Sequence, residues 1–145
     1  MRRFTTLALI TLSAVGLLSC QSYSTGLQRS VAHADETTAV AALHAIAVAQ
    51  QTYSLSNGGN YGSMEQLREG GYLDVRFNST NGGVKDYSLT IDTKPQSGGV
   101  PASYSCNADP TNTGQEAGRH FYIDSASAAI HVNANQPASA ADPVY

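Results

Sequence analysis

Apolar and polar residues alternate with two different periods along the chain. From about Arg29 to Leu55 the sequence is rich in Ala and contains neither Pro nor Gly. Apolar residues recur there at spacings of three and four, as on one face of an α-helix: Val40, Leu43, Ile46, Ala47 and Tyr53. Gln50 falls on the same face and interrupts the stripe. The acidic pair Asp35–Glu36 either begins this helix, near its positive pole, or lies on the exposed side of a longer helix.

Turn-forming residues end the predicted helix. Asn57-Gly58-Gly59-Asn60 stops it, and Ser63-Met64-Glu65-Gln66 has the pattern of a capping box with Ser63 as N-cap. The sequence therefore predicts a second, short helix that ends at Gly70-Gly71. Residues 78–83 are turn-rich and form a linker.

Beyond this linker the apolar period changes to two, which is typical of strands with one buried face. Three segments show it, at about 87–92, 102–107 and 119–132, the last as a hairpin. A long helix followed by a small antiparallel meander predicts an α+β fold, with the helix packed on a sheet of about four strands. We expect residues 133–145, with Pro137 and Pro143, to form a flexible C-terminal tail.

The hairpin allows two registers with the same faces. A two-residue turn at Ser125-Ala126 pairs Phe121 with Ile130 and places His120 opposite His131 on the outer face, whereas a four-residue loop slides the pairing and separates the two His. His120, His131 and Asp124 are the candidates for an enzymatic or metal-binding role. Asp109, Asn112 and Glu116 lie in a polar loop over 107–118 that is rich in oxygen ligands but lacks the EF-hand spacing.

The composition and residue spacing exclude several kinds of functional site. No His/Cys cluster has zinc spacing, no nucleophile–base pair can be argued, and no basic patch suggests nucleic acid. We therefore predict a protein that is not an enzyme and has no cofactor. Cys106 alternates with polar residues and is expected to point inward as a small apolar residue, and the lone His44 beside the helix stripe is expected to be a bystander.

The N-terminus has the layout of a secretory signal. Arg2 and Arg3 precede an apolar run over 7–18 that is shorter than the roughly 20 residues of a membrane-spanning helix. At its end, Leu17-Leu18-Ser19-Cys20 resembles the lipobox of bacterial lipoproteins. That resemblance implies cleavage before Cys20 and acylation of Cys20, and two or more acyl chains anchor a protein stably to a bilayer. Gln21 after the cysteine favours the outer membrane over retention at the inner membrane.

The predicted mature chain contains six basic and 11 acidic residues, a formal charge of −5, because Arg2 and Arg3 leave with the signal. Its parts are the signal over 1–19, the acylated cysteine and a polar tether over 20–30, a domain over 31–132 and the tail over 133–145. The predicted location is the cell envelope, at the periplasmic face or surface of the outer membrane.

Residues 31–132 resemble the globular part of type IV pilins and type II secretion pseudopilins. The resemblance rests on the Ala-rich run over 39–53 that ends in Gln-Thr-Tyr, the Tyr-Gly turn and short helix over 61–67, Gly71-Tyr72-Leu73, and the strand patterns at 87–91 and 121–132. It implies the same α+β fold and a role in protein–protein interaction, with a pilus or type II secretion apparatus as the suggested partner. Prepilins, however, retain their apolar segment as a stalk, whereas here that segment precedes Cys20. The alternative function is an atypical pilin or minor pseudopilin subunit assembled into a fibre.

Overall fold

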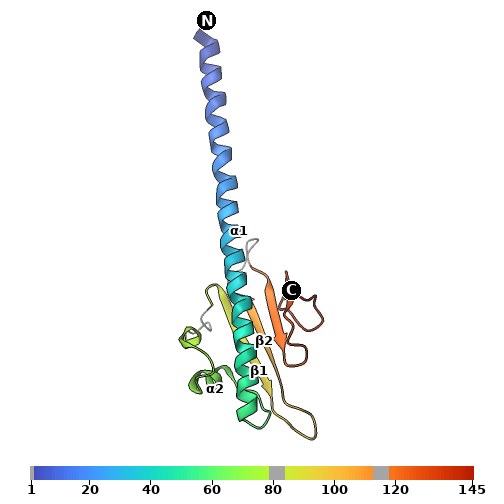
Figure 1. Ribbon diagram of the computed structural model, residues 1–145. Helices are drawn as coiled ribbons and strands as arrows, with labels where there is room; N and C mark the ends of the chain where they lie inside the picture. The colour runs from blue at the N-terminus through green and yellow to red at the C-terminus, as the bar shows by residue number, and fades with distance from the viewer. Residues whose placement is uncertain (1, 79–83, 113–117) are drawn as a thin grey trace.

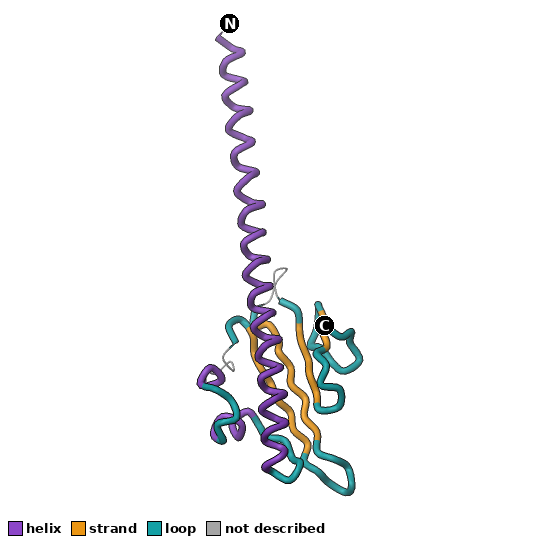
Figure 2. Tube along the Cα trace, viewed as in Figure 1, coloured by secondary structure: helices purple, strands orange, loops and turns teal. Residues whose placement is uncertain are grey.

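The computed structural model describes residues 2–78, 84–112 and 118–145, with only the backbone described for 2–25, 28, 29 and 78. The predicted α+β fold is confirmed: a long helix packs on a four-stranded antiparallel sheet (Figures 1 and 2). The elements are α1 (Arg2–Ser56), α2 (Met64–Glu69), the 3₁₀ helix η1 (Val75–Asn78), β1 (Tyr87–Lys94), β2 (Ser103–Pro110), β3 (His120–Asp124) and β4 (His131–Asn133).

Helix α1 covers one face of the sheet with a stripe of small and branched apolar side chains. Ala39, Leu43 and Ile46 are fully buried against β2 and β3. The helix ends as predicted, because Gly58 and Gly59 adopt φ of 62° and 85°, a left-handed conformation that favours glycine. Its backbone is helical from Arg2, so Asp35 and Glu36 do not begin it.

The short helix α2 confirms the predicted capping box. The Ser63 hydroxyl accepts a hydrogen bond from the Gln66 N–H at 3.2 Å, and the Gln66 side chain accepts one from the Ser63 N–H at 2.9 Å. These two bonds satisfy backbone donors that the first turn of a helix leaves unpaired. Leu67 is buried beneath this turn and joins α2 to the core.

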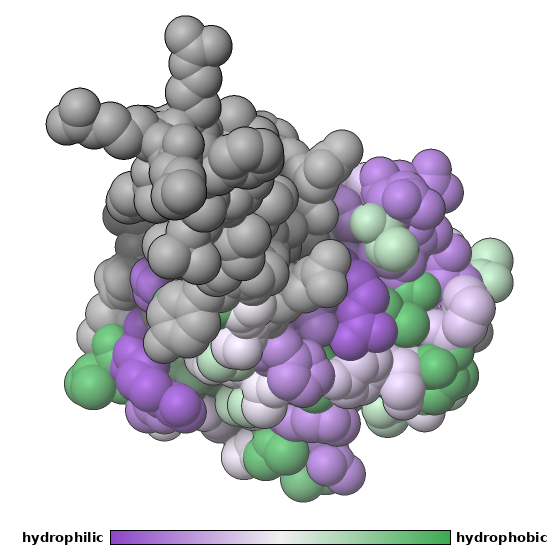
Figure 3. Space-filling model, turned by 90° about the horizontal axis from the view of Figure 1, so that it is seen from above, coloured by the Kyte–Doolittle hydropathy of each residue, from purple (hydrophilic) through white to green (hydrophobic). Residues whose placement is uncertain are grey.

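The sheet has the strand order β1-β2-β3-β4, with every neighbouring pair antiparallel. The core-facing residues of β2 and β3 include Cys106, Ala108, Phe121 and Ile123, all fully buried. Strand β2 continues to Pro110, so Asp109 lies in a strand and not in the predicted polar loop. Among the described residues visible along the direction of α1, hydrophilic and hydrophobic ones are interspersed (Figure 3).

The β3–β4 hairpin adopts the longer-loop register. Phe121 pairs with Val132 and Tyr122 with His131, so the pairing of Phe121 with Ile130 is wrong. The Asp124 carboxylate explains this choice, since it accepts hydrogen bonds from the Ala126 and Ser127 N–H groups, both at 3.0 Å, and thereby stabilises the longer loop.

The C-terminal segment packs on the sheet, contrary to the prediction of a flexible tail. The Val132 N–H donates to the Pro143 carbonyl at 2.9 Å, and the Tyr145 N–H donates to the Ile130 carbonyl at 2.8 Å. Ala138 is buried, and its carbonyl accepts a hydrogen bond from the Asn107 side chain at 2.9 Å. Residues 138–145 therefore cover part of the outer face and continue the sheet beyond β4.

Candidate functional site

Cys20, the predicted site of lipidation, lies in the first half of α1, where the structure describes the backbone but no side chains. Its modification stays a prediction. Within the part of the chain that the structure describes, no helix combines the length and the apolar character that crossing a membrane requires.

Of His120, His131 and Asp109, the predicted candidates for metal ligands, the structure brings His120 and Asp109 together. The His120 Nδ1 lies 2.6 Å from Asp109 Oδ1, across neighbouring strands on the outer face of the sheet. No group of three or more His, Cys, Asp or Glu side chains that could hold a metal ion is found among the described residues. Glu116, the other acidic candidate of this region, lies outside them. The pair by itself is a cross-strand polar contact that orients the imidazole.

The third candidate, His131, is separated from that pair. It lies opposite Tyr122, whereas His120 lies opposite Asn133. His131 is only 8% exposed, and its Nδ1 is 2.6 Å from the Asp142 carbonyl, so the expected surface imidazole is instead covered by the C-terminal segment. The two His are therefore diagonal neighbours on the outer face, each occupied by a different partner.

Asp124, proposed as a partner of the two His, has a structural role. Although partial burial raises its pKa, the hydrogen bonds from the Ser127 and Ala126 N–H groups and from the Tyr122 hydroxyl hold the pKa below its usual value. The Tyr122 hydroxyl lies 3.2 Å from Asp124 Oδ2. A carboxylate that accepts these bonds is stabilised in its ionised form and is a poor general base.

Cys106 points inward as predicted and is fully buried. Burial is the main cause that raises the pKa of its thiol well above the usual value, with a smaller contribution from Asp109 and Asp92. Because the thiolate is the nucleophilic form, a buried thiol of this kind is inert in the folded protein.

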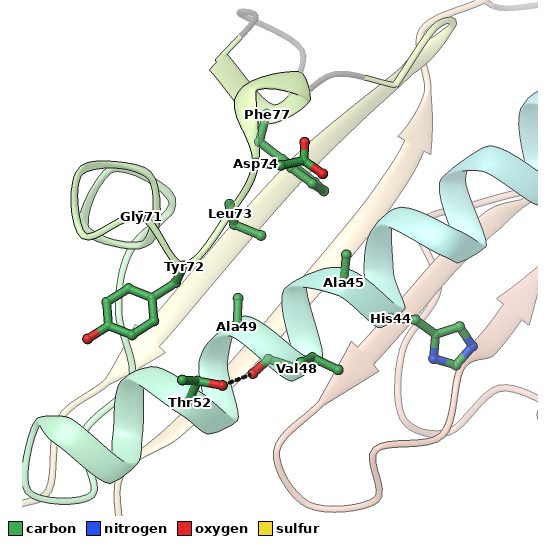
Figure 4. A pocket seen from close by; sticks show the side chains of 10 residues that line it. All are labelled: His44, Ala45, Val48, Ala49, Thr52, Gly71, Tyr72, Leu73, Asp74 and Phe77. Carbon is green, nitrogen blue, oxygen red and sulfur yellow. Dashed lines mark hydrogen bonds between the residues drawn. The ribbon is translucent and has the colours of Figure 1, made fainter.

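A groove between α1 and residues 71–77 was not predicted from the sequence. It is a hollow of about 660 Å³, and its lining is mostly apolar. Figure 4 shows Leu73 and Phe77 facing Ala45 and Ala49 across it. The carboxylate of Asp74 at its margin is paired with Arg76 at 2.7 Å, which lowers the pKa of Asp74. The groove thus offers a surface for contact and not a set of reacting groups.

Two polar contacts fix α1 to the rest of the domain. Glu36 is buried, and its carboxylate accepts hydrogen bonds from the Arg119 backbone N–H at 2.9 Å and from the guanidinium at 2.8–3.3 Å. Gln50 is fully buried, and its amide exchanges two hydrogen bonds with the backbone of Gly62, at 2.6 and 2.9 Å. The polar interruption of the apolar stripe is therefore the residue that holds the loop after α1.

No family model, curated protein or solved structure matches this chain. The α+β fold is shown by the structure alone, and the resemblance to pilins and pseudopilins stays a hypothesis based on sequence patterns.

Proposed function

We propose that this protein is a lipoprotein of the bacterial cell envelope, anchored by acyl chains on Cys20, whose domain binds other envelope proteins without catalysing a reaction. The observation that carries the proposal is the position of Leu17-Leu18-Ser19-Cys20 at the end of a short apolar run that follows Arg2 and Arg3. The bilayer, reached through Cys20, is the first partner. A component of a pilus or type II secretion apparatus is the more specific partner that the resemblance suggests.

The side-chain contacts and the apolar surfaces of the domain support a binding role. Three of the described carboxylates are engaged in structural contacts: Asp109 with His120, Asp124 with its own loop, and Glu36 with Arg119. The apolar groove beside α1 and the exposed face of that helix are the surfaces left for partners. Binding of protein surfaces is the function that apolar surfaces of this kind commonly serve.

Metabolic labelling with a clickable palmitate analogue tests the anchor. Wild type and Cys106→Ala should incorporate the label and fractionate with membranes, whereas Cys20→Ala should do neither. Cys106→Ala is the matched control, because it removes the only other cysteine of the chain from a buried site. Labelling of Cys20→Ala at the wild-type level would refute the proposal.

A fibre subunit is the second candidate, and one observation favours it. It is the sequence pattern over 31–132, which resembles the globular part of type IV pilins and type II secretion pseudopilins. Mass spectrometry of the mature N-terminus separates the two functions. An acylated Cys20 as first residue supports the lipoprotein, and a methylated residue upstream of Cys20 supports the fibre subunit.

A further inference from the structure

The face of α1 that points away from the sheet is uncovered. Figures 1 and 2 show the helix in front of the sheet, with its flanks bordered by the segments around α2 and β3 but its outer face free. Among the α1 side chains that the structure describes, four large apolar ones are exposed: Leu27 (52%), Val31 (49%), Val48 (64%) and Leu55 (83%). Water-exposed residues of this kind are ordinary when scattered singly, but here they share one face.

These residues belong to a regular series. Alternating steps of four and three connect nine positions of α1, which we call the α1 seam: Leu27, Val31, Ala34, Thr38, Ala41, Ala45, Val48, Thr52 and Leu55. None is charged, and all except the half-buried Ala45 are exposed. A spacing of alternately three and four residues, sustained over about four heptads, is the pattern of a coiled coil.

Apart from Ala45, which packs against the core, the α1 seam is distinct from the stripe that packs on the sheet. Ala41, Ala45 and Val48 each follow a buried core residue by two positions, which turns them about 200° around the helix. Those core residues are Ala39, Leu43 and Ile46. A surface helix ordinarily carries charged residues opposite its buried stripe, whereas residues 37–56 contain no Asp, Glu, Lys or Arg. The helix therefore has two faces suited to packing, and the described part of the chain uses one.

We propose that a second copy of this chain packs along the α1 seam, forming a parallel two-stranded coiled coil. The distribution of side chains favours this partner. Within parallel coiled coils, β-branched residues at the a positions with Leu at the d positions favour two strands. Here the a positions hold Val31, Thr38, Ala45 and Thr52, and the d positions begin and end with Leu27 and Leu55.

The residues beside the α1 seam are compatible with this pairing. In a parallel coiled coil, each g position faces the e position five residues further along the other helix. The pairs whose residues the structure describes are Ser30 with Asp35, Thr37 with Ala42, His44 with Ala49, and Gln51 with Ser56; the e residues Ala42 and Ala49 are buried in the core of their own domain. None places like charges opposite each other. Hollows of about 660 and 300 Å³ flank Val48 on its two sides, so the domain leaves room around the seam.

The composition of the α1 seam predicts a weak dimer. Most of its positions are Ala or Thr, which bury little apolar surface, so the dimer is favoured where copies are concentrated and similarly oriented. Anchoring of both chains in one bilayer supplies both conditions, and for that contribution alone the inference rests on the proposed function. The shared orientation of the two chains in the bilayer makes their helices parallel.

Cysteine crosslinking of the full chain in native membranes tests the dimer. Leu27→Cys, Val48→Cys and Leu55→Cys should each form a disulfide-linked dimer on mild oxidation, because equivalent a and d positions meet across a parallel, in-register coiled coil. Thr90→Cys is the control, since Thr90 is exposed on β1 and far from the seam in sequence. We expect at least fivefold more dimer for the three seam variants than for Thr90→Cys, and no dimer for wild type.

A second test introduces a negative charge into the α1 seam. Val48→Glu in the Leu55→Cys background should reduce the crosslinked dimer at least fivefold, whereas Ser88→Glu should not change it. An unchanged circular dichroism melt shows that Val48→Glu preserves the fold. If the melt changes, Ala41→Glu is used in place of Val48→Glu. Crosslinking of the seam variants at the Thr90→Cys level, or no effect of either glutamate, would overturn the proposal. Palmitate labelling of the same samples separates this failure from failure of the lipid anchor.

Discussion

The buried amide of Gln50 gives the sharpest test of how α1 is held in the domain. Its side chain is fully buried and exchanges hydrogen bonds of 2.6 and 2.9 Å with both backbone groups of Gly62, which is also buried. We propose Gln50→Leu as the perturbation, because leucine has a similar volume and fills the site but pairs with neither group. Gln51→Leu is the matched control, since the same change is made one residue further on, at an exposed position.

The expected magnitude follows from the groups left unpaired. A buried backbone N–H or C=O without a partner costs about 1–3 kcal/mol. Two such groups cost about 4 kcal/mol at mid-range and burying leucine regains about 2 kcal/mol, so Gln50→Leu should lose about 2 kcal/mol in the free energy of unfolding. Gln51→Leu should change it by less than about 0.5 kcal/mol, as is usual for surface substitutions away from special contacts.

Urea unfolding of the purified proteins, followed by circular dichroism, measures both values. The slope with denaturant should be the same for the three proteins, so that the difference reports stability and not compactness. If Gln50→Leu were as stable as Gln51→Leu, the two bonds to Gly62 would contribute nothing measurable, and the role assigned to Gln50 would be wrong.

Three further predictions concern the ion pair, the C-terminal segment and the thiol. Burial raises the pKa of Glu36, but the hydrogen bonds and charge of Arg119 lower it below its ordinary value of 4.5. Because the ion pair is partly exposed, Glu36→Gln should lower the free energy of unfolding by about 1–2 kcal/mol at pH 7. A carboxylate with a lowered pKa stabilises the fold at pH values above its pKa in the unfolded state. The stability difference between wild type and Glu36→Gln should therefore shrink as the pH falls below about 4.5. Equal stability differences at pH 7 and pH 3, measured by urea unfolding, would contradict this prediction. Hydrogen exchange should show slow exchange at Val132 and Tyr145, whose N–H groups are bonded, and fast exchange at the exposed turn residues 98–99; fast exchange at all of them would mean that the segment is frayed. Cys106 should react with a maleimide at least about 100-fold more slowly in the native protein than in urea, and rapid native labelling would show that the thiol is accessible.

Local patterns predicted much of the fold. The Ala-rich helix, its end at Gly58-Gly59, the capping box at Ser63 and the inward position of Cys106 each depend on residues close in sequence, and the structure confirms them. Such features are set by backbone conformation and by the alternation of apolar residues, which the sequence displays directly.

Contacts between distant residues could not be predicted in this way. Glu36 and Arg119 are separated by 83 positions, and nothing local to either residue indicates the other. Gln50 resembled a defect in the apolar stripe because its partner is a backbone, which carries no sequence signal. The hairpin register stayed open for a related reason: a shift of two residues keeps every side chain on the same face, so alternation cannot decide between the two loops.

The C-terminal segment was misjudged from its composition. Pro and Ala give it no period, so the sequence predicted neither strand nor helix over 133–145. Its order comes from partners elsewhere, namely the edge of β4 and the side chains of Asn107, Asn133 and His131. The C-terminal segment also buries His131, one of the candidate metal ligands. The wrong prediction of a flexible tail therefore led to the wrong prediction of an exposed imidazole at His131.

The pairing of residues 143–145 with β4 makes the sheet unequal at its two ends. Beyond β4 lies only the short stretch 143–145, in which Pro143 and Tyr145 face β4 and Val144 is the residue whose backbone faces outward. At the opposite end, β1 presents an eight-residue strand to its surroundings. Strand addition to the sheet, whether in assembly or in aggregation, therefore has a longer edge to pair with at β1 than at the other end.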